Sequence, residues 1–110
     1  MLYTEFVVGE KTYKLRLGIR TIIQLEKDLG MNPVMIFANA ANKHAPTMEQ
    51  MVLVLYHSLH YENPEITMDE TYDIFDAWLA DGHITGDFVT VITSVFMESG
   101  IFKKEKTEKN

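Results

Sequence analysis

The 110-residue chain contains no cysteine. Disulfides, thiolate zinc sites, iron–sulfur clusters and cysteine nucleophiles are therefore excluded, and this composition fits a reducing cytoplasm. Long apolar runs are also missing: the longest extends only from Met51 to Tyr56, far too short to cross a bilayer. The N-terminus has no basic region followed by an apolar stretch, so we expect no signal peptide. These absences predict a protein of the cytoplasm.

Lysine and arginine are absent between Lys43 and Lys103. The first 43 residues carry six bases and four acids, and the last eight carry four lysines and two glutamates. The stretch between them holds ten acids, so charges of +2, −10 and +2 sum to the net −6. Because nucleic acids and anionic membranes are bound by clustered lysine and arginine, we expect neither as a partner. The acidic stretch predicts that the partners are proteins.

Alternating side chains at the start of the chain predict a β-hairpin over residues 2–17. Phe6 and its alternate neighbours precede the turn Gly9-Glu10, after which Tyr13, Leu15 and Leu17 share one face. Period-two alternation on both sides of a glycine-containing turn is typical of hairpins. A hairpin alone is marginally stable in water, so one face should lie on helices.

Helical patterns follow over about residues 19–99. The first helix should run from Ile19 to Leu29, with Gly30 past its end. Its predicted apolar side comprises Ile19, Ile22, Ile23, Leu25 and Leu29. Asn32-Pro33 indicates the cap and start of a short helix, followed by a loop over residues 41–46.

Two capping boxes, Thr47-Met48-Glu49-Gln50 and Thr67-Met68-Asp69-Glu70, predict two further helix starts. The first of these helices is apolar on several sides, which indicates a central, buried position. The second should place Met68, Tyr72, Phe75 and Leu79 on one face, with Asp69, Glu70, Asp73 and Asp76 outward. We interpret Met48, Met51 and Met68 as core residues.

A last helix should begin near residues 85–87 and stop at Gly100. Its predicted core side comprises Phe88, Val91, Ile92, Val95 and Phe96, and Ile101 and Phe102 are expected to fold back over its end. The predicted class is α+β and mostly helical, with an N-terminal β-hairpin followed by a compact bundle of four to five helices. We expect one domain over residues 1–102 and a disordered, lysine-rich tail over residues 103–110.

No residue pattern indicates catalysis. His57 and His60 lie three residues apart, so a metal could bind them if His83 or Glu62 supplied a third ligand. The simpler interpretation is two partly exposed polar side chains on an apolar helix. Asp69, Asp73 and Asp76 have the spacing of an ordinary solvated helix face as well as that of paired catalytic carboxylates. We therefore predict a protein without enzymatic activity, catalytic residues, metal or cofactor.

Two segments are candidates for partner binding. The first contains Met31, Val34, Met35 and Phe37 beside a loop, where methionine suits adaptable surfaces, although core filling is an equal alternative. The second is the helix surface of Asp69, Tyr72, Asp73 and Asp76. Its acids could simply keep the protein soluble, or they could imitate the phosphates of DNA and occupy a basic protein.

The order of these sequence features along the chain resembles the order found in a known protein family. The hairpin over residues 3–17 is followed by Arg20, then Leu25-Glu26-Lys27-Asp28-Leu29-Gly30 and Asn32-Pro33, and an acidic helical body ends in Ser99-Gly100-Ile101-Phe102. Over essentially its whole length, the chain is similar to the tail assembly chaperones of siphophages and related prophages.

The resemblance implies a role in tail morphogenesis. Such chaperones keep the tape measure protein soluble, help to recruit tail tube subunits around it, and are absent from the mature virion. The expected location is the cytoplasm of the bacterial host, and self-association stays open. In many members a ribosomal frameshift near the end of the frame produces a longer form, for which Lys103-Lys104 is a candidate position. The alternatives are a minor structural or connector protein of a phage morphogenesis module, and an acidic DNA mimic.

Overall fold

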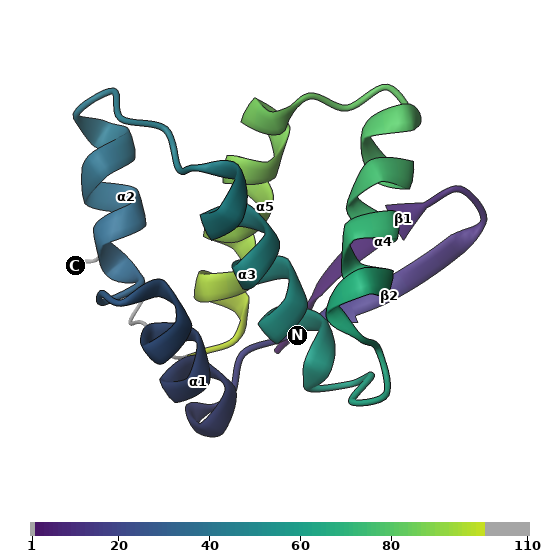
Figure 1. The fold of residues 1–110 in the computed structure, drawn as a ribbon, viewed down its shortest axis with the longest axis horizontal. Helices are drawn as coiled ribbons and strands as arrows, with labels where there is room; N and C mark the ends of the chain where they lie inside the picture. The colour runs from purple at the N-terminus through teal and green to yellow at the C-terminus, as the bar shows by residue number, and fades with distance from the viewer. Residues whose placement is uncertain (1, 101–110) are drawn as a thin grey trace, which may run out of the picture.

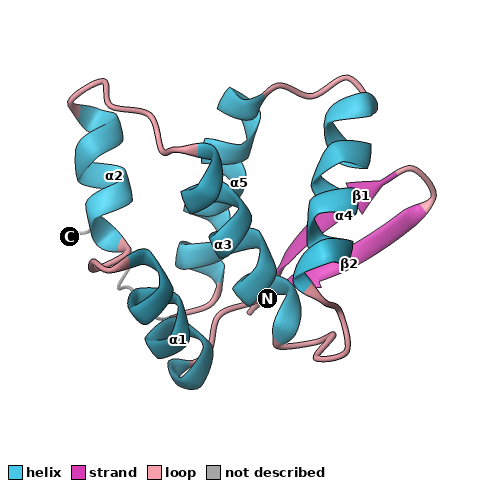
Figure 2. Cartoon of the chain, viewed as in Figure 1, coloured by secondary structure: helices cyan, strands magenta, loops and turns pink. Residues whose placement is uncertain are grey.

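The computed structural model describes residues 2–100, apart from the side chains of Phe37 and Ala41. A two-stranded antiparallel hairpin precedes five helices within this range (Figures 1 and 2). The elements are β1 (Thr4–Val8), β2 (Lys11–Leu15), α1 (Ile19–Leu29), α2 (Val34–Ala41), α3 (Met48–His60), α4 (Met68–Ala80) and α5 (Thr85–Glu98). The predicted α+β, mostly helical fold is confirmed. The predicted tail and the packing of Ile101 and Phe102 lie outside the described residues.

The hairpin lies against the helices through one face, as predicted. Phe6 pairs with Tyr13 across the strands, and the turn glycine, Gly9, has φ 60° in the left-handed region that favours glycine. Phe6 and Leu15 are buried, whereas Lys14 on the opposite face is exposed. The Gly9 N–H donates to Asp81 Oδ2 over 2.7 Å, which ties the turn to the end of α4.

Helix α3 lies in the middle of the molecule. It packs against α1, β2, α4 and α5 (Figure 1). Val54, Leu55 and Leu59 are almost fully buried, because apolar side chains on several sides of α3 meet a different neighbour on each side. The prediction of a central helix is confirmed.

The predicted apolar side of α1 is partly wrong. Ile22 and Leu25 are buried and Leu29 packs against the core, but Ile19 and Ile23 are exposed to solvent. Helix α1 packs mainly against α3, so only one narrow stripe of its surface is covered. Ile19 and Ile23 fall outside that stripe although their spacing is helical.

Four aromatic rings from three elements form the centre of the core beneath α4. Trp78 stacks on Phe6 with ring centroids 5.2 Å apart, and Phe75 lies 4.8 Å from Phe88 of α5. The buried face of α4 is therefore Thr71, Phe75 and Trp78, and our sequence reasoning overlooked Trp78. The predicted face of Met68, Tyr72, Phe75 and Leu79 exists, but it borders a groove: only Phe75 of this face is buried, and Leu79 packs partly against the core. On α5, Phe88, Ile92, Val95 and Phe96 are buried and Val91 packs partly against them, as predicted.

Both predicted capping boxes are present. Thr47 Oγ1 accepts from the Gln50 N–H over 3.1 Å, and Gln50 Oε1 accepts from the Thr47 N–H over 2.9 Å. Thr67 and Glu70 form the same reciprocal pair at the start of α4. Helix α2 extends through residue 41, so the following loop begins later than predicted. None of the helices described is long and apolar enough to cross a membrane.

Candidate functional site

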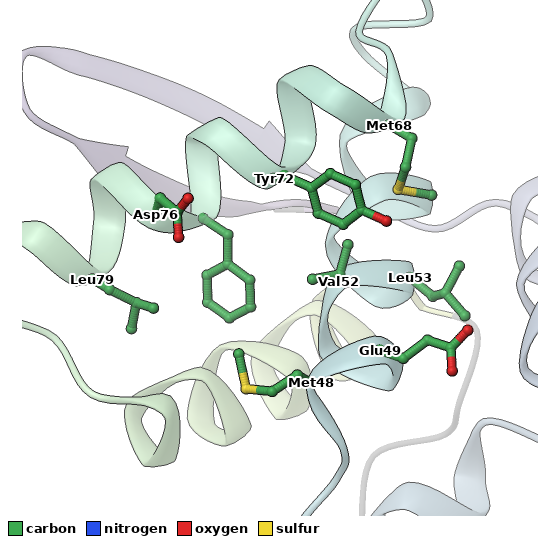
Figure 3. A pocket seen from close by; sticks show the side chains of 9 residues that line it. Met48, Glu49, Val52, Leu53, Met68, Tyr72, Asp76 and Leu79 are labelled. Carbon is green, nitrogen blue, oxygen red and sulfur yellow. The ribbon is translucent and has the colours of Figure 1, made fainter.

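An open apolar groove of about 650 Å³ lies between α3 and α4 (Figure 3). The two helices run in opposite directions along it (Figure 1). Helix α3 contributes Met48, Glu49, Val52 and Leu53, and helix α4 contributes Met68, Tyr72, Phe75, Asp76 and Leu79. Seven of these nine side chains are mainly apolar, counting Tyr72, so the groove presents hydrocarbon, thioether and aromatic surface to solvent.

The groove has a buried aromatic base and exposed edges. Phe75 is buried in the aromatic cluster and also lines the groove, so it connects this surface to the core. Met48 is 51% exposed and Tyr72 is 50% exposed. Methionine is unbranched and polarizable, and therefore fits partners of irregular shape. This combination is suited to binding an apolar segment of another protein.

The placement of the methionines corrects part of our interpretation. Met51 is buried, as predicted, but Met48 is half exposed and Met68 is half buried at the groove. Met48 and Met68 are each the first residue of their helix, directly after a capping threonine. Side chains at a helix start are flanked by helix on one side only, and neither of these two is enclosed by the core.

Two carboxylates accompany the apolar surface. Figure 3 shows Asp76 on the α4 side and Glu49 on the α3 side, with Met48 and Val52 between them. Both carboxylates belong to exposed residues. No lysine or arginine lines the groove, because none occurs between residues 44 and 102.

The structure separates the two predicted partner surfaces. Tyr72 and Asp76 line the groove, whereas Asp69 is exposed elsewhere on α4 and Asp73 borders a different hollow beside Lys11 of β2. Figure 1 places α2 on the other side of α3 from α4, so the segment around residues 31–37 does not reach the groove.

The segment before and within α2 divides between core and surface. Met31 is partly buried against the core, whereas Val34 and Met35 at the start of α2 are exposed. Ile36, which follows the exposed Met35, is buried. The side chain of Phe37 lies outside the described residues.

The structure places the two histidines of α3 in different surroundings. His57 is buried, and its Nε2 lies 2.7 Å from Asp28 Oδ2 of α1. The interpretation of two partly exposed histidines is therefore wrong for His57, because Asp28 satisfies its ring inside the α1–α3 contact. His60 is partly buried. Among residues 2–100, no three histidine or acidic side chains come together in a way that could hold a metal ion.

A family model described as a family of unknown function, DUF6096, matches residues 4–110. The chain belongs to this family. No curated protein and no solved structure matches the chain. The DUF6096 match begins at the first residue of β1 and covers every described helix, so the groove is built entirely from DUF6096 residues.

Sequence reasoning missed most of the α3 wall in this DUF6096 protein. Val52 and Leu53 belong to the helix that the sequence predicted to be central and buried, and both prove to be half buried at the groove. One signal could have indicated the site: Thr47-Met48 and Thr67-Met68 place an apolar residue at the first position of two consecutive helices. The pairing of α3 with α4 is needed to bring these positions to one surface.

Proposed function

We propose that this protein is a tail assembly chaperone of a siphophage or prophage. In this role it binds and solubilises the tape measure protein and helps to recruit tail tube subunits during tail morphogenesis. The protein acts by binding, without catalysis and without a cofactor. The sequence resemblance supports the proposal through the hairpin, the segment Leu25–Gly30 and Asn32-Pro33.

The exposed groove between α3 and α4 is the observation that carries a chaperone role. A tape measure protein is long, helical and apolar in places, so it would aggregate if these places were exposed. An amphipathic helix can place its apolar face in a groove between two helices. The groove offers Met48, Tyr72 and Leu79 for such a contact.

The charge distribution suits the same role. Ten acids without an intervening base give the part of the chain that contains α3, α4 and α5 a strongly negative charge. Like charges on the exterior keep complexes dispersed while a client is held. The protein would therefore bind through an apolar strip and stay soluble through the acids around it.

Co-expression with the tape measure protein of the same phage tests the proposal. The wild type should co-purify with this client and keep it in the soluble fraction. The double variant Met48→Asp/Tyr72→Asp should lose both effects, because it places charge in the groove at two half-exposed positions. The control Ile19→Asp/Ile84→Asp introduces the same two charges at apolar residues that are more exposed and lie outside the groove, and it should behave like the wild type.

Two results would contradict the proposal. One is a wild-type protein that neither co-purifies with the tape measure protein nor improves its solubility. The other is detection of the protein in purified virions, because a chaperone leaves before the tail is complete. That result would instead support a minor structural or connector role in the same assembly process.

A further inference from the structure

We infer that the groove between α3 and α4 selects a cationic amphipathic helix, with apolar anchors along one face and lysine or arginine on both flanks. The inference rests on the proposed function and extends it, because it specifies the chemistry of the client segment that the chaperone recognises. It also makes the groove selective, since many apolar helices would lack the flanking charges.

The groove has the length of a short helix. Its lining on α4 extends from Met68 to Leu79, which corresponds to about 16 Å at 1.5 Å per residue. This is about three helical turns. A bound helix would therefore place anchors at positions i, i+3 or i+4, and i+7 along the groove.

An extended peptide is a poorer occupant. The walls are two helices, whose backbone N–H and C=O groups are already used within each helix. A strand placed against them would leave its own backbone groups facing Met48, Val52 and Leu79 without partners. A helix satisfies its backbone internally and offers only side chains to these walls.

The sign of the charge at the edges determines which helix is preferred. Glu49 and Asp76 flank the apolar strip on opposite sides (Figure 3), and neither forms an ion pair with another residue of the described range. Helices α3, α4 and α5 contain no lysine or arginine that could neutralise them. Cationic side chains on the flanks of the bound helix would meet these carboxylates, whereas anionic flanks would be repelled.

Peptide binding to the purified full-length protein tests the inference. Three fluorescent helical peptides of about five turns share one backbone design. The first has leucine and methionine anchors with lysine flanks, the second has the same anchors with glutamate flanks, and the third has lysine flanks with serine anchors. We expect the lysine-flanked peptide to bind about tenfold or more tightly than the glutamate-flanked one, and the serine-anchored peptide to bind too weakly to measure.

Charge reversal in the protein identifies the carboxylates responsible. The variant Glu49→Lys/Asp76→Lys should prefer the glutamate-flanked peptide. The control Glu10→Lys/Glu62→Lys changes the net charge by the same amount at exposed residues outside the groove, and it should keep the wild-type preference. Equal binding of the lysine- and glutamate-flanked peptides would overturn the inference, as would a reversal of preference in the control.

The outcomes also separate this inference from the proposed function. A protein that binds the lysine-flanked peptide in the groove but does not solubilise the tape measure protein would support the inference and contradict the proposed function. A protein that solubilises the tape measure protein but does not distinguish the peptides would support the function and overturn the inference.

Discussion

At the residue scale, Trp78 joins the hairpin, α4 and α5 through its aromatic contacts in the core. Its ring lies within 5.9 Å of the rings of Phe6, Phe75 and Phe88, and only 4% of the residue is exposed. Replacing it with alanine would leave a large cavity between the hairpin and two helices. We expect Trp78→Ala to lower the free energy of unfolding by about 3–5 kcal/mol, measured by urea denaturation followed by circular dichroism.

The control for Trp78→Ala is Tyr72→Ala on the same helix. Tyr72 is half exposed and lines the groove, so its removal should change the free energy of unfolding by less than about 1 kcal/mol. A larger cost for Tyr72→Ala than for Trp78→Ala would show that the core face of α4 has been misidentified.

The two faces of α4 explain why the sequence did not identify Trp78 as a core residue. Met68, Tyr72 and Leu79 form one apolar stripe with Phe75, and Thr71 and Trp78 form another with the same Phe75. Periodicity alone does not distinguish the stripes. The choice depends on Phe6, which comes from the hairpin far earlier in the chain and covers only one of them.

At the element scale, the start of α5 lacks half of its capping interaction. The Ile84 N–H donates to Asp87 Oδ2 over 3.0 Å, but Ile84 has no side-chain oxygen to accept from the first turn. Ile84 is extended, with φ −119° and ψ 164°, and 67% exposed. We expect Ile84→Ser to raise the free energy of unfolding by about 1 kcal/mol, measured by urea denaturation.

The variant Ile84→Ala separates capping from the loss of an exposed apolar side chain. Alanine removes the same hydrocarbon but supplies no acceptor, so we expect a small change in stability. If Ile84→Ser and Ile84→Ala raised the free energy of unfolding equally, the added cap would not be the cause of the stabilisation.

Helix ends were more predictable than helix faces. Thr47, Thr67 and Gly30 mark ends through contacts with residues three or four positions away, and such contacts are visible in the sequence. The exposure of Ile19 and Ile23 depends instead on how much of α1 its neighbours cover. That is a property of the packed molecule, which no window of the sequence contains.

At the scale of the whole molecule, the groove also combines features that the sequence shows with features that depend on packing. The sequence indicated Tyr72 and Asp76 because they lie on one acidic helix, but not the opposite wall of Val52 and Leu53. A groove between two helices arises only when both are packed. The acids could be predicted as a solubilising exterior, whereas their position beside an apolar strip could not.

The buried apolar side chains form one continuous cluster from the hairpin to α5, which predicts that the protein unfolds as one unit. Trp78 is the only tryptophan, so its fluorescence reports on the hairpin, α4 and α5, whereas circular dichroism reports on all helices. Leu25→Ala, a buried change in α1, should cost about 2–5 kcal/mol and shift both urea transitions equally. The control Ile23→Ala, an exposed change in the same helix, should shift neither appreciably. If Leu25→Ala shifted only the dichroism transition, α1 would unfold separately from the region around Trp78, and the prediction of a single domain would be wrong.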